Sequence, residues 1–568
     1  MNKQLFFFFF LFSFFVKEAN AQFFPAKNYP QQYFIWPVKS PVGIVANFGE
    51  LRPNHYHMGL DCRTSQGENT TVVAAADGYV CRVNIDANGF GRAIYICHPN
   101  GFTTLYAHLN DFFPELQAYV LDQQYKLQKW AVNLEIPANL FPVKQGQFIA
   151  KSGNTGGSQG PHLHFEIRDS KTEKVLNPLL FGLPIKDNVP PLVIRLAVYD
   201  RRVSTYEQTP VIYALKKVNG KFQPQNETIS VHTDRVSFAI SATDSYTGST
   251  NPNGIYSAIV FDNNQPISGF QLDSISYDET RYLNAHIDYK TKMSGGPFLQ
   301  HLTKLPGYIT NIYKTPAGGD GLIYLNDNKQ HAIKIEVSDA DGNSSVVMFN
   351  LNKSDGPMSP VFTKEGKLFV PDHLNIFENE KISLHFPENF IYDTFHFVYG
   401  SSLNNGSVVY KLSEDNIPVH QYFPISIKET FDNKDSSKII MKQWANEKIR
   451  FRKANYSPNG YTAYFRDFGK YQLILDTLPP KLTALGGFKD GSQWEHKNTI
   501  SFAVKDNTET IKEFIGTIDG NWVLFTNDKE RDFIYTIDKN CPPGEHILKI
   551  IVKDLAGNSS EALYHFKN

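Results

Sequence analysis

The chain has 568 residues, a formal net charge of −1 and a sequence pI near 7.0, so its overall charge gives no reason to expect a nucleic-acid partner. This length predicts three or four domains. Hydrophobic residues make up 41% of the chain and aromatic residues 14%, which is enough for several buried cores, and the excess of Phe and Tyr over Met favours strands over helices.

The N-terminus reads MNKQLFFFFFLFSFFVKEANAQ and has the pattern of a signal peptide over residues 1–21. Lys3 supplies a positive charge, residues 5–15 form an apolar stretch, and Ala19-Asn20-Ala21 matches an A-x-A cleavage site. The apolar stretch is too short to cross a bilayer, and Gln22 stands where a lipoprotein would have cysteine. We therefore expect an exported protein, periplasmic or associated with the cell envelope, with no transmembrane segment in the mature chain. An uncleaved anchor is the alternative.

An HxxxD pattern, His57 to Asp61, follows a stretch of short predicted strands and turns. Arg52 and His55 lie just ahead of it. His55 is six residues before Asp61 rather than four, so we expect it to line a pocket rather than to bind a metal.

Residues 72–83 and 92–97 predict the two strands of a hairpin around Asn88-Gly89. Cys81 and Cys97 lie on these strands and could pair as a disulfide in an exported protein, although two unpaired buried thiols are an equal alternative. A further alternating run ends at His108. Short strands with turns at this density predict a compact all-β unit.

Residues 114–129, PELQAYVLDQQYKLQK, predict a surface helix. Its apolar residues are Leu116, Val120 and Leu127, and Pro114 stands where a helix would begin. Two interpretations remain open for this helix: a lid beside a groove, or an insertion that only packs against the rest of the unit.

The stretch SGNTGGSQGPHLHFE, residues 152–166, joins a glycine-rich turn to a predicted strand. Successive side chains of a strand point to opposite faces, so His162 and His164 should face one side while the apolar residues between and after them face a core. No helix and no Lys-Ser/Thr pair follows the glycines, which argues against phosphate binding. A catalytic zinc typically has three protein ligands and a water, and the histidines and the carboxylate named so far provide enough donors for such a site.

HxxxD, then Tyr106-Ala107-His108, then SGNTG…GPHLHFE, in that order, resemble the lysostaphin/LytM family of zinc metalloendopeptidases, which cut peptide cross-links in bacterial cell walls. The resemblance covers roughly residues 34–181 and implies a small β-sandwich with a groove. It also implies one zinc ion bound by His57, Asp61 and His164, with His108 and His162 as the two catalytic histidines. Which of these two is the general base stays open.

Three further residues are candidates for hydrogen bonding to the ligands or for binding substrate. Tyr106 and Glu166 stand in register with the predicted site, and Glu166 as the general base is an additional option. Arg52 follows Phe48-Gly49, which resembles the FGxR sequence of the family with one extra residue before the arginine.

The rest of the chain contains an internal repeat. Residues 331–345, HAIKIEVSDADGNSS, match residues 546–560, HILKIIVKDLAGNSS, at nine of fifteen positions, and an Asp-x-x-Pro-Pro sequence begins each copy. Alternating strands closed by a Gly-Asn turn predict immunoglobulin-like β-sandwiches, the first with an insertion over about residues 274–320. Residues 339–343, DADGN, resemble a calcium loop, but the glycine is misplaced and position twelve is Asn350, so we predict a turn.

The expected fold is therefore mainly β, a small LytM-type β-sandwich with a helical insertion followed by several immunoglobulin-like β-sandwich domains. The expected boundaries are 1–21 for the signal peptide, 22–185 for the peptidase domain, 186–352 for a β-sandwich with insertion, 353–475 for a β-rich domain and 476–568 for an immunoglobulin-like domain.

The leading functional hypothesis is an exported zinc metalloendopeptidase that hydrolyses peptide cross-links of peptidoglycan, with a zinc-activated water and a histidine base. The alternative is a non-catalytic LytM-type scaffold that binds the wall or activates an amidase, although such relatives usually lack one or more of the five site residues. An adhesin or structural stalk would explain the repeats but not the site. The β-domains are expected to position the enzyme, to bind the wall or an envelope protein partner, or to mask the groove.

Overall fold

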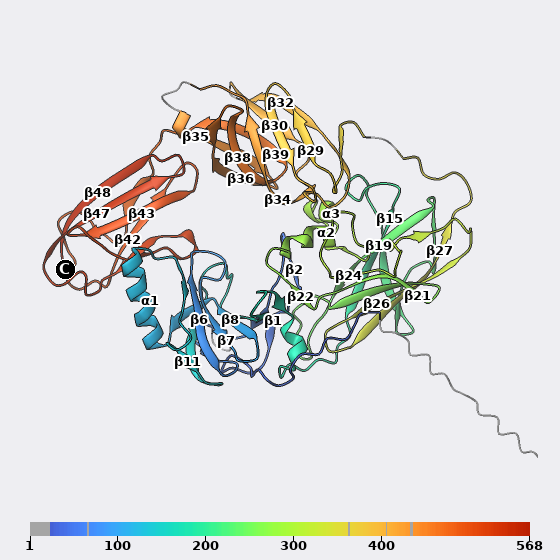
Figure 1. The fold of residues 1–568 in the computed structure, drawn as a ribbon, viewed down its shortest axis with the longest axis horizontal. Coiled ribbons are helices and arrows are strands. Elements are labelled where there is room, and N and C mark those ends of the chain that lie inside the picture. The colour runs from blue at the N-terminus through green and yellow to red at the C-terminus, as the bar shows by residue number, and fades with distance from the viewer. Residues whose placement is uncertain (1–22, 65–66, 362–363, 405, 432–435) are drawn as a thin grey trace, which may run out of the picture.

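The computed structural model describes residues 23–64, 67–361, 364–404, 406–431 and 436–568. The expected signal peptide, residues 1–21, lies outside the described residues. Within the described ranges, no helix has both the length and the apolar character that a membrane crossing requires. The chain is mainly β, as expected, and Figure 1 shows β-rich units that follow one another in a ring, so that the C-terminal unit returns to the N-terminal one.

The first unit, residues 23–186, has two sheets that pack around one core. The larger sheet has the strand order β1-β4-β13-β8-β7-β6-β10, with β11 and β14 added to it, and the smaller sheet has the order β5-β12-β9. Leu60, Leu163 and Phe165 point into the core between them, which gives the alternation expected for the HLHFE strand. The strands are β1 (Ile44–Ala46), β2 (Leu51–Arg52), β3 (His55–Tyr56), β4 (Leu60–Cys62), β5 (Thr71–Val73), β6 (Gly78–Ile85), β7 (Arg92–Cys97), β8 (Phe102–Ala107), β9 (Leu109–Phe112), β10 (Val132–Glu135), β11 (Pro142–Val143), β12 (Phe148–Ser152), β13 (Leu163–Asp169) and β14 (Val175–Leu176), followed by the 3-10 turn η1 (Pro178–Phe181).

The predicted helix is α1, Pro114–Leu127, with Pro114 in its first turn. Leu116 and Val120 are buried as expected, but Leu127 is 51% exposed. Gln124 occupies the third buried position instead, because its side-chain amide donates a hydrogen bond to the carbonyl of Trp130 at 2.5 Å. The apolar face of α1 therefore ends one turn before the helix does.

Strands β6 and β7 form the predicted hairpin, and a disulfide joins Cys81 to Cys97. The pairing register shifts between Val80 and Arg82, so Cys81 is the extra residue of a β-bulge. A bulge changes the direction of the side chain it carries, here toward the partner strand.

The second unit, residues 187–354, is built on the strand order β23-β19-β15-β16-β17-β27-β26-β20-β21-β24. The expected insertion, about residues 274–320, carries short helical turns and reaches the first unit, where β22 pairs with β14. The elements are β15 (Leu192–Asp200), β16 (Val211–Val218), β17 (Lys221–Pro224), β18 (Thr228–Val231), β19 (Arg235–Thr243), β20 (Ser257–Asp262), β21 (Gln265–Gln271), β22 (Ser274–Ile275), η2 (Thr280–Tyr282), α2 (Leu283–His286), α3 (Tyr289–Met293), β23 (Gln300–His301), β24 (Tyr313–Lys314), β25 (Ile323–Tyr324), β26 (His331–Ser338) and β27 (Ser344–Lys353).

The third unit, residues 367–475, consists of two five-stranded sheets, ordered β29-β30-β34-β38-β37 and β32-β33-β39-β35-β36, with a small β28-β31 pair. Its core is continuous with that of the second unit. The elements are β28 (Lys367–Phe369), β29 (Asn375–Glu378), β30 (Ile382–Phe386), β31 (Phe395–Phe397), β32 (Tyr399–Asn404), β33 (Ser407–Leu412), β34 (Pro418–Ile427), η3 (Ser436–Lys438), β35 (Ile439–Ala445), β36 (Lys448–Lys453), β37 (Asn455–Ser457), β38 (Gly460–Asp467) and β39 (Gly469–Leu475).

The fourth unit, residues 476–568, has a core of its own between sheets β40-β42-β46-β45 and β41-β48-β47-β43-β44. The two repeat sequences form matching hairpins, β26–β27 in the second unit and β47–β48 here. The elements are β40 (Lys481–Ala484), β41 (Ser492–Gln493), β42 (Thr499–Lys505), β43 (Ile511–Ile518), β44 (Asn521–Trp522), β45 (Phe525–Thr526), η4 (Asp528–Glu530), β46 (Phe533–Thr536), β47 (Glu545–Asp554) and β48 (Ser559–Lys567).

The ring closes where α1 meets the fourth unit (Figure 1). Tyr125 of α1 donates a hydrogen bond from its hydroxyl to Oδ2 of Asp538 at 2.5 Å, and its ring packs edge-on against Trp522 with 5.4 Å between the ring centres. The helix therefore packs against a distant part of the chain, and these contacts favour the packing interpretation over the lid.

Candidate metal centre

Two neighbouring antiparallel strands of the larger sheet bring the predicted ligands together. Asp61 on β4 lies directly opposite His164 on β13, so their side chains leave the sheet on the same face. His57 lies in the turn before β4. All three side chains are buried, with exposed fractions of 6 to 8%.

The ligand atoms of these three residues converge on one point. Nε2 of His57 is 2.9 Å from Oδ1 of Asp61, Nδ1 of His164 is 3.0 Å from the same oxygen, and the two ring nitrogens are 3.1 Å apart. A tetrahedral zinc ion with bonds of about 2.0–2.2 Å would place neighbouring ligand atoms about 3.4 Å apart. The three observed distances of 2.9, 3.0 and 3.1 Å are slightly shorter than this, so the ligand atoms would have to move apart by a few tenths of an ångström to hold the ion.

Hydrogen bonds on the far sides of the two rings fix which nitrogens carry protons. Nδ1 of His57 donates to the carbonyl oxygen of Asn47 at 2.7 Å, and Nε2 of His164 donates to Oε1 of Glu166 at 2.9 Å, since neither oxygen can donate. The nitrogens that face Asp61 are then lone-pair acceptors, as is the carboxylate itself. Three acceptors at this distance repel one another unless a cation lies between them, so the donor set fits a zinc ion.

The charged groups around the three ligands also favour a positive charge at the point where the ligand atoms meet. With no cation between the ligands a proton takes its place: burial alone would lower the pKa of His164, but its hydrogen bonds to Asp61 and Glu166 raise it to about 9, which reflects the negative potential at this ring. Burial would raise the pKa of Asp61, yet when the histidines are protonated the charge of His57 and hydrogen bonds from the surrounding rings hold it well below its usual range, so a positive charge at this point favours the carboxylate. The pocket thus favours a positive charge at its centre.

Glu166 is fully buried and connects the centre to two residues that sequence analysis missed. Its Oε2 is 2.7 Å from Nη2 of Arg168, and its Oε1 accepts a hydrogen bond from the hydroxyl of Tyr277 at 2.5 Å. Burial opposes ionisation, but the charge of Arg168 and the hydrogen bonds from His164 and Tyr277 lower the pKa of Glu166 to about 2. Glu166 is therefore an ionised carboxylate that orients His164, and its two occupied oxygens do not suit a general base.

The two predicted catalytic histidines lie together beside the ligands. The rings of His108 and His162 have centres 4.8 Å apart, and Nε2 of His162 is 3.3 Å from Oδ1 of Asp61. Nδ1 of His108 donates to the carbonyl of Thr155 at 2.9 Å, and Nδ1 of His162 donates to the carbonyl of Gly160 at 2.7 Å. In both rings Nε2 is therefore left as the proton acceptor. Burial, followed by the charges of the neighbouring histidines, lowers the pKa of His108 to about 3, which keeps this ring neutral.

The prediction for Tyr106 was wrong. Its side chain is buried in the core against Phe165, and its hydroxyl accepts hydrogen bonds from the amide of Ala75 at 2.8 Å and from Thr104 at 3.0 Å. The backbone of His108 has a positive φ of 62°, which breaks the strand alternation after Ala107. His108 therefore turns to the centre although Tyr106, two residues earlier, faces the core.

Arg52 and His55 lie at the edge of the centre on the small β2–β3 hairpin. Nη2 of Arg52 is 3.6 Å from Oδ2 of Asp61 and 3.2 Å from Oε1 of Glu50, so Arg52 approaches the ligand carboxylate from outside. His55 is exposed, and its Nδ1 lies 2.9 Å from the carbonyl of Pro53, away from the three ligands.

The glycine-rich segment beside the centre is covered by a loop of the fourth unit. Oδ1 of Asp528 accepts a hydrogen bond from the amide of Gly156 at 2.8 Å. Nζ of Lys529 donates to the carbonyl of Ser158 at 2.6 Å and to the side chain of Asn154 at 3.2 Å. Sequence analysis gave no signal for this contact, because the partners are more than 370 residues apart.

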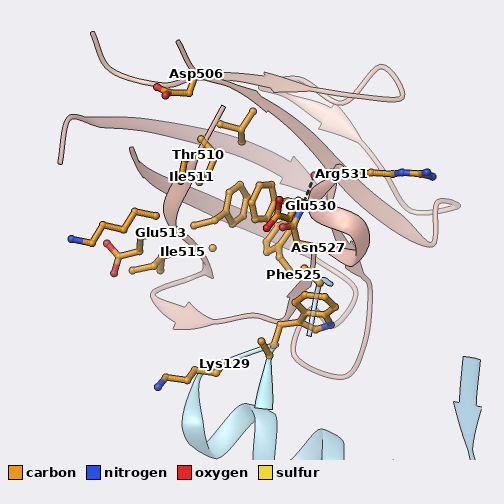
Figure 2. A pocket seen from close by; sticks show the side chains of 18 of the residues that line it. Lys129, Asp506, Thr510, Ile511, Glu513, Ile515, Phe525, Asn527, Glu530 and Arg531 are labelled. Carbon is orange, nitrogen blue, oxygen red and sulfur yellow. Dashed lines mark hydrogen bonds between the residues drawn. The ribbon is translucent and has the colours of Figure 1, made fainter. Parts of the chain in front are cut away.

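A separate cavity of about 1170 Å³ lies where the chain after α1 meets the fourth unit. Figure 2 shows side chains of the fourth unit around this cavity, with Phe525, Asn527 and Glu530 near the middle of the view and Lys129 of the first unit below them. None of the five predicted metal-binding and catalytic residues lines it, so the cavity belongs to the ring closure and not to the metal centre.

Comparisons with known proteins agree with the geometry. The sequence model of Peptidase family M23 matches residues 55–124 and 139–178, and that of the Zu5-like domain matches residues 366–476. An uncharacterized metalloprotease of Haemophilus influenzae is 37% identical over 136 residues, 24% of this chain and 22% of that protein. The DD-carboxypeptidase/endopeptidase Mpg of Neisseria meningitidis is 35% identical over 128 residues, 22% of this chain and 23% of its own length.

Two more distant similarities complete the comparison. The murein hydrolase activator NlpD of Escherichia coli is 32% identical over 146 residues, 26% of this chain and 30% of its own length. The catalytic domain of the prophage-encoded M23 protein EnpA of Enterococcus faecalis has 22% identity and a TM-score of 0.19, with 26% of this chain and 95% of that domain covered. The chain spans about a fifth of the length of the first curated relatives it matches.

The family match begins at the hairpin that carries His55, includes most of α1 and the whole HLHFE strand, and ends just after β14, so it contains all three predicted ligands and both histidines predicted to be catalytic. The third unit, expected only as a β-rich domain, has a family match of its own. The first unit of this chain is therefore a peptidase family M23 domain of LytM type, and its third unit is a Zu5-like domain.

Proposed function

We propose that the protein is an exported zinc metalloendopeptidase that hydrolyses peptide cross-links of peptidoglycan. The observation that carries the proposal is the set of three acceptor atoms on His57, Asp61 and His164, which needs a cation and has two further histidines on one side. A purely structural metal site is closed by protein ligands, whereas this one has three ligands and leaves a fourth position for water.

A zinc ion in this set would lower the pKa of its bound water and polarise the scissile carbonyl. The protein side chains then handle protons and position. His108 and His162 each present an unprotonated Nε2, so either of them can accept the proton of the attacking water. The imidazolium formed in this way carries an N–H at Nε2, which can donate to the tetrahedral oxyanion and then pass its proton to the leaving amine. Glu166 and the carbonyl of Asn47 hold the ligand rings in the orientation that keeps their lone pairs on the metal side.

The names of the relatives support a cell-wall substrate but point to two roles. One relative is named a DD-carboxypeptidase/endopeptidase and another a murein hydrolase activator. The second role, a non-catalytic activator, is favoured by the fourth-unit loop that covers the glycine-rich segment. The presence of all five predicted ligand and catalytic residues favours the enzyme.

The test is a mass-spectrometric digest of purified cross-linked muropeptides with the chain from Gln22 onward, with and without a zinc chelator. We expect conversion of dimers to monomers that stops with chelator and with His162→Ala, and the product masses identify the bond. Zinc binding without conversion, combined with stimulation of a separately added amidase, would instead establish the activator.

A further inference from the structure

A second cluster of acidic residues lies away from the metal centre, at the junction between the M23 domain and the second unit. Asp187 begins the chain segment that leaves the M23 domain, Asp244 follows β19, and Asp339 follows β26. One carboxylate oxygen from each lies within 4.8 Å of the other two, and all three residues are buried. Asp341 stands at the exposed edge of the cluster.

Asp244 has no hydrogen-bond partner on either carboxylate oxygen, although only 3% of its surface is exposed. Oδ2 of Asp187 is also buried without a partner. Asn253 faces Asp244 across an isolated β-bridge, and its side-chain oxygen is a further buried acceptor without a donor. Buried polar atoms are nearly always paired, so this group of unpaired oxygens indicates a missing partner.

No positive side chain compensates these acids. Among the described residues, none of the ion pairs includes Asp187, Asp244 or Asp339. Burial, together with the charges of Asp339 and Asp187, raises the pKa of Asp244 to about 7. The natural partner of several buried carboxylates is a metal cation.

The fourth unit provides an internal comparison, because Asp476, Asp506 and Asp554 stand at the equivalent places of the second repeat. There Asn507 donates a side-chain hydrogen bond to Asp476 at 3.1 Å, and Thr508 donates its amide to Asp506 at 2.8 Å. One oxygen of each, Oδ2 of Asp476 and Oδ1 of Asp506, is still buried without a partner, whereas Asp244 has both oxygens unpaired. Ala556 replaces the fourth acid, Asp341. Within the described residues the fourth unit holds no comparable metal-binding group, so the convergence is specific to the second unit.

We propose that Asp187, Asp244 and Asp339 bind a calcium ion, with the side-chain oxygen of Asn253 as a further ligand. All donors are oxygens, as hard cations require, and calcium accepts carboxylates and amide oxygens from flexible loops at about 2.3–2.6 Å. The ligands come from three separated segments, so the site differs from the single calcium loop that residues 339–343 superficially resemble; those residues form a turn, as predicted.

The calcium site is linked to the zinc ligands by a short chain of hydrogen bonds. The bridge between Asp244 and Asn253 closes a loop whose next residue, Gly254, exchanges two hydrogen bonds of 2.8 and 2.9 Å with the side chain of Asn47. The carbonyl of Asn47 holds His57. Calcium at this site therefore fixes the loop that positions one zinc ligand.

The test is isothermal titration and thermal unfolding of the chain from Gln22 onward, with zinc present and calcium controlled by EGTA. We expect one calcium per chain and a rise in Tm on its addition. Asp244→Asn removes a buried charge, so it should raise Tm in EGTA and abolish the further rise with calcium. Asp506→Asn, at the equivalent place of the fourth unit, should keep the calcium response.

Asp187→Asn is the second variant and should also lose the calcium response, which keeps the test valid if Asp244→Asn fails to fold. Absence of binding up to about 10 mM calcium, well above the dissociation constants of about 10⁻⁴–10⁻³ M typical of extracellular sites, would overturn the proposal. So would an unchanged calcium response in both variants, or a response to magnesium but not to calcium.

Discussion

At the scale of single residues, the centre is defined by which nitrogen of each histidine is free. His57 and His164 each use one ring nitrogen to hold a neighbouring oxygen and present the other to Asp61. His108 and His162 use the same device but lie beside the ligands rather than among them. The four rings thus share one kind of hydrogen bond, and their position relative to Asp61 separates the two predicted ligands from the two histidines predicted to be catalytic.

The first prediction concerns this division of roles. Asp61→Ala and His164→Ala each remove one of three ligands and should give protein that loses zinc on dialysis, measured as metal content per chain. His162→Ala leaves the ligands intact and should retain zinc while turnover falls by about 10²–10⁴-fold, the range for a lost general acid or base. Wild-type turnover in His162→Ala would reject its catalytic role.

The second prediction concerns Glu166, which holds His164 and pairs with Arg168. Arg168 is only 5% exposed, and Glu166→Gln leaves it with Glu173 as its one remaining carboxylate, a half-exposed partner 3.1 Å from Nη1. The variant should therefore destabilise the fold, by less than the roughly 3–5 kcal/mol expected for a buried charge with no partner at all. Loss of such an outer partner also weakens metal binding by about 10–100-fold. Chelator competition and denaturant unfolding measure the two effects.

Tyr277→Phe is the matched control for Glu166→Gln. It removes one hydrogen bond to Glu166 and keeps the Glu166–Arg168 pair, so we expect a loss of about 1 kcal/mol and nearly unchanged zinc affinity. If both variants lost the same amount of folding stability and zinc affinity, the Glu166–Arg168 ion pair would contribute no more than the hydrogen bond from Tyr277.

The convergence of His57, Asp61 and His164, with His108 and His162 beside them, could be predicted because their spacing on short segments is a local pattern. Asp61 and His164 meet through strand pairing, which the alternation of β13 already indicated. Tyr106 was mispredicted because the left-handed backbone at His108 cannot be inferred from an alternating run. Arg168 shares a strand face with Glu166 and could have been found by the same alternation, whereas Tyr277 is 111 residues from Glu166 and could not.

At the scale of elements, the insertion of the second unit is the part that sequence patterns described least. It was expected only as extra length, yet its β22 extends the M23 sheet and its short helices pack two buried histidines, His286 and His301. The hairpins and α1 were predicted well, because turn residues and periodicity are local signals. The pairing of β22 with β14 depends on contacts about 100 residues apart, which periodicity does not reveal.

The third prediction is that the folded state loses stability at acidic pH because of two buried histidines in this insertion. Burial lowers the pKa of His286 and of His301 to about 3, so in the folded state both stay neutral where the unfolded chain, with a pKa near 6.5, binds protons. A lowered pKa of a base means that stability is lost as pH falls below about 6.5, by up to about 1.4 kcal/mol per pH unit for each histidine.

Denaturant unfolding from pH 7 to pH 5 measures this slope. His286→Gln keeps a polar side chain next to Gln300 and Tyr313 but cannot titrate, so the slope should fall by about one proton relative to the wild type. His373→Gln, at an exposed histidine of the third unit, is the control and should leave the slope unchanged. An equal slope in His286→Gln would assign the acid sensitivity to other groups.

At the scale of the whole molecule, the chain forms a ring in which the fourth unit returns to the M23 domain (Figure 1). Several hydrogen bonds close it, among them those of Tyr125 with Asp538 and of the Asp528–Lys529 turn with the glycine-rich segment. Asn88 also donates to Glu530 at 2.7 Å, and the amide of Lys529 donates to the carbonyl of Ala87 at 2.8 Å. The sequence predicted the separate β-rich units from their repeats and strands, but ring closure depends on side-chain complementarity between distant surfaces. The same limit applies to the calcium cluster, whose acids are brought together only by folding.

The fourth prediction is that opening the ring exposes the glycine-rich segment beside the metal centre. Asp528→Ala with Lys529→Ala removes a hydrogen bond to Gly156 and a charged hydrogen bond to Ser158, together about 2–4 kcal/mol of docking free energy. This shifts the balance between docked and undocked fourth unit by about 30- to 1000-fold. We expect a larger radius of gyration by X-ray scattering and faster cleavage of intact cross-linked wall, with little change for a small muropeptide dimer that enters without undocking.

Asp532→Ala is the matched control for ring opening, since this exposed residue lies in the same loop and makes none of the contacts with the M23 domain. It should leave both scattering and cleavage unchanged. If the double variant expands but cleaves intact wall no faster, the loop fixes the shape of the ring without restricting access to the centre. If neither quantity changes, the other hydrogen bonds of the closure hold the fourth unit in place, namely those of Tyr125 with Asp538, of Asn88 with Glu530 and of the Lys529 amide with the carbonyl of Ala87. Adding Tyr125→Phe and Asn88→Ala to the double change removes the two that depend on side chains and is then the decisive measurement.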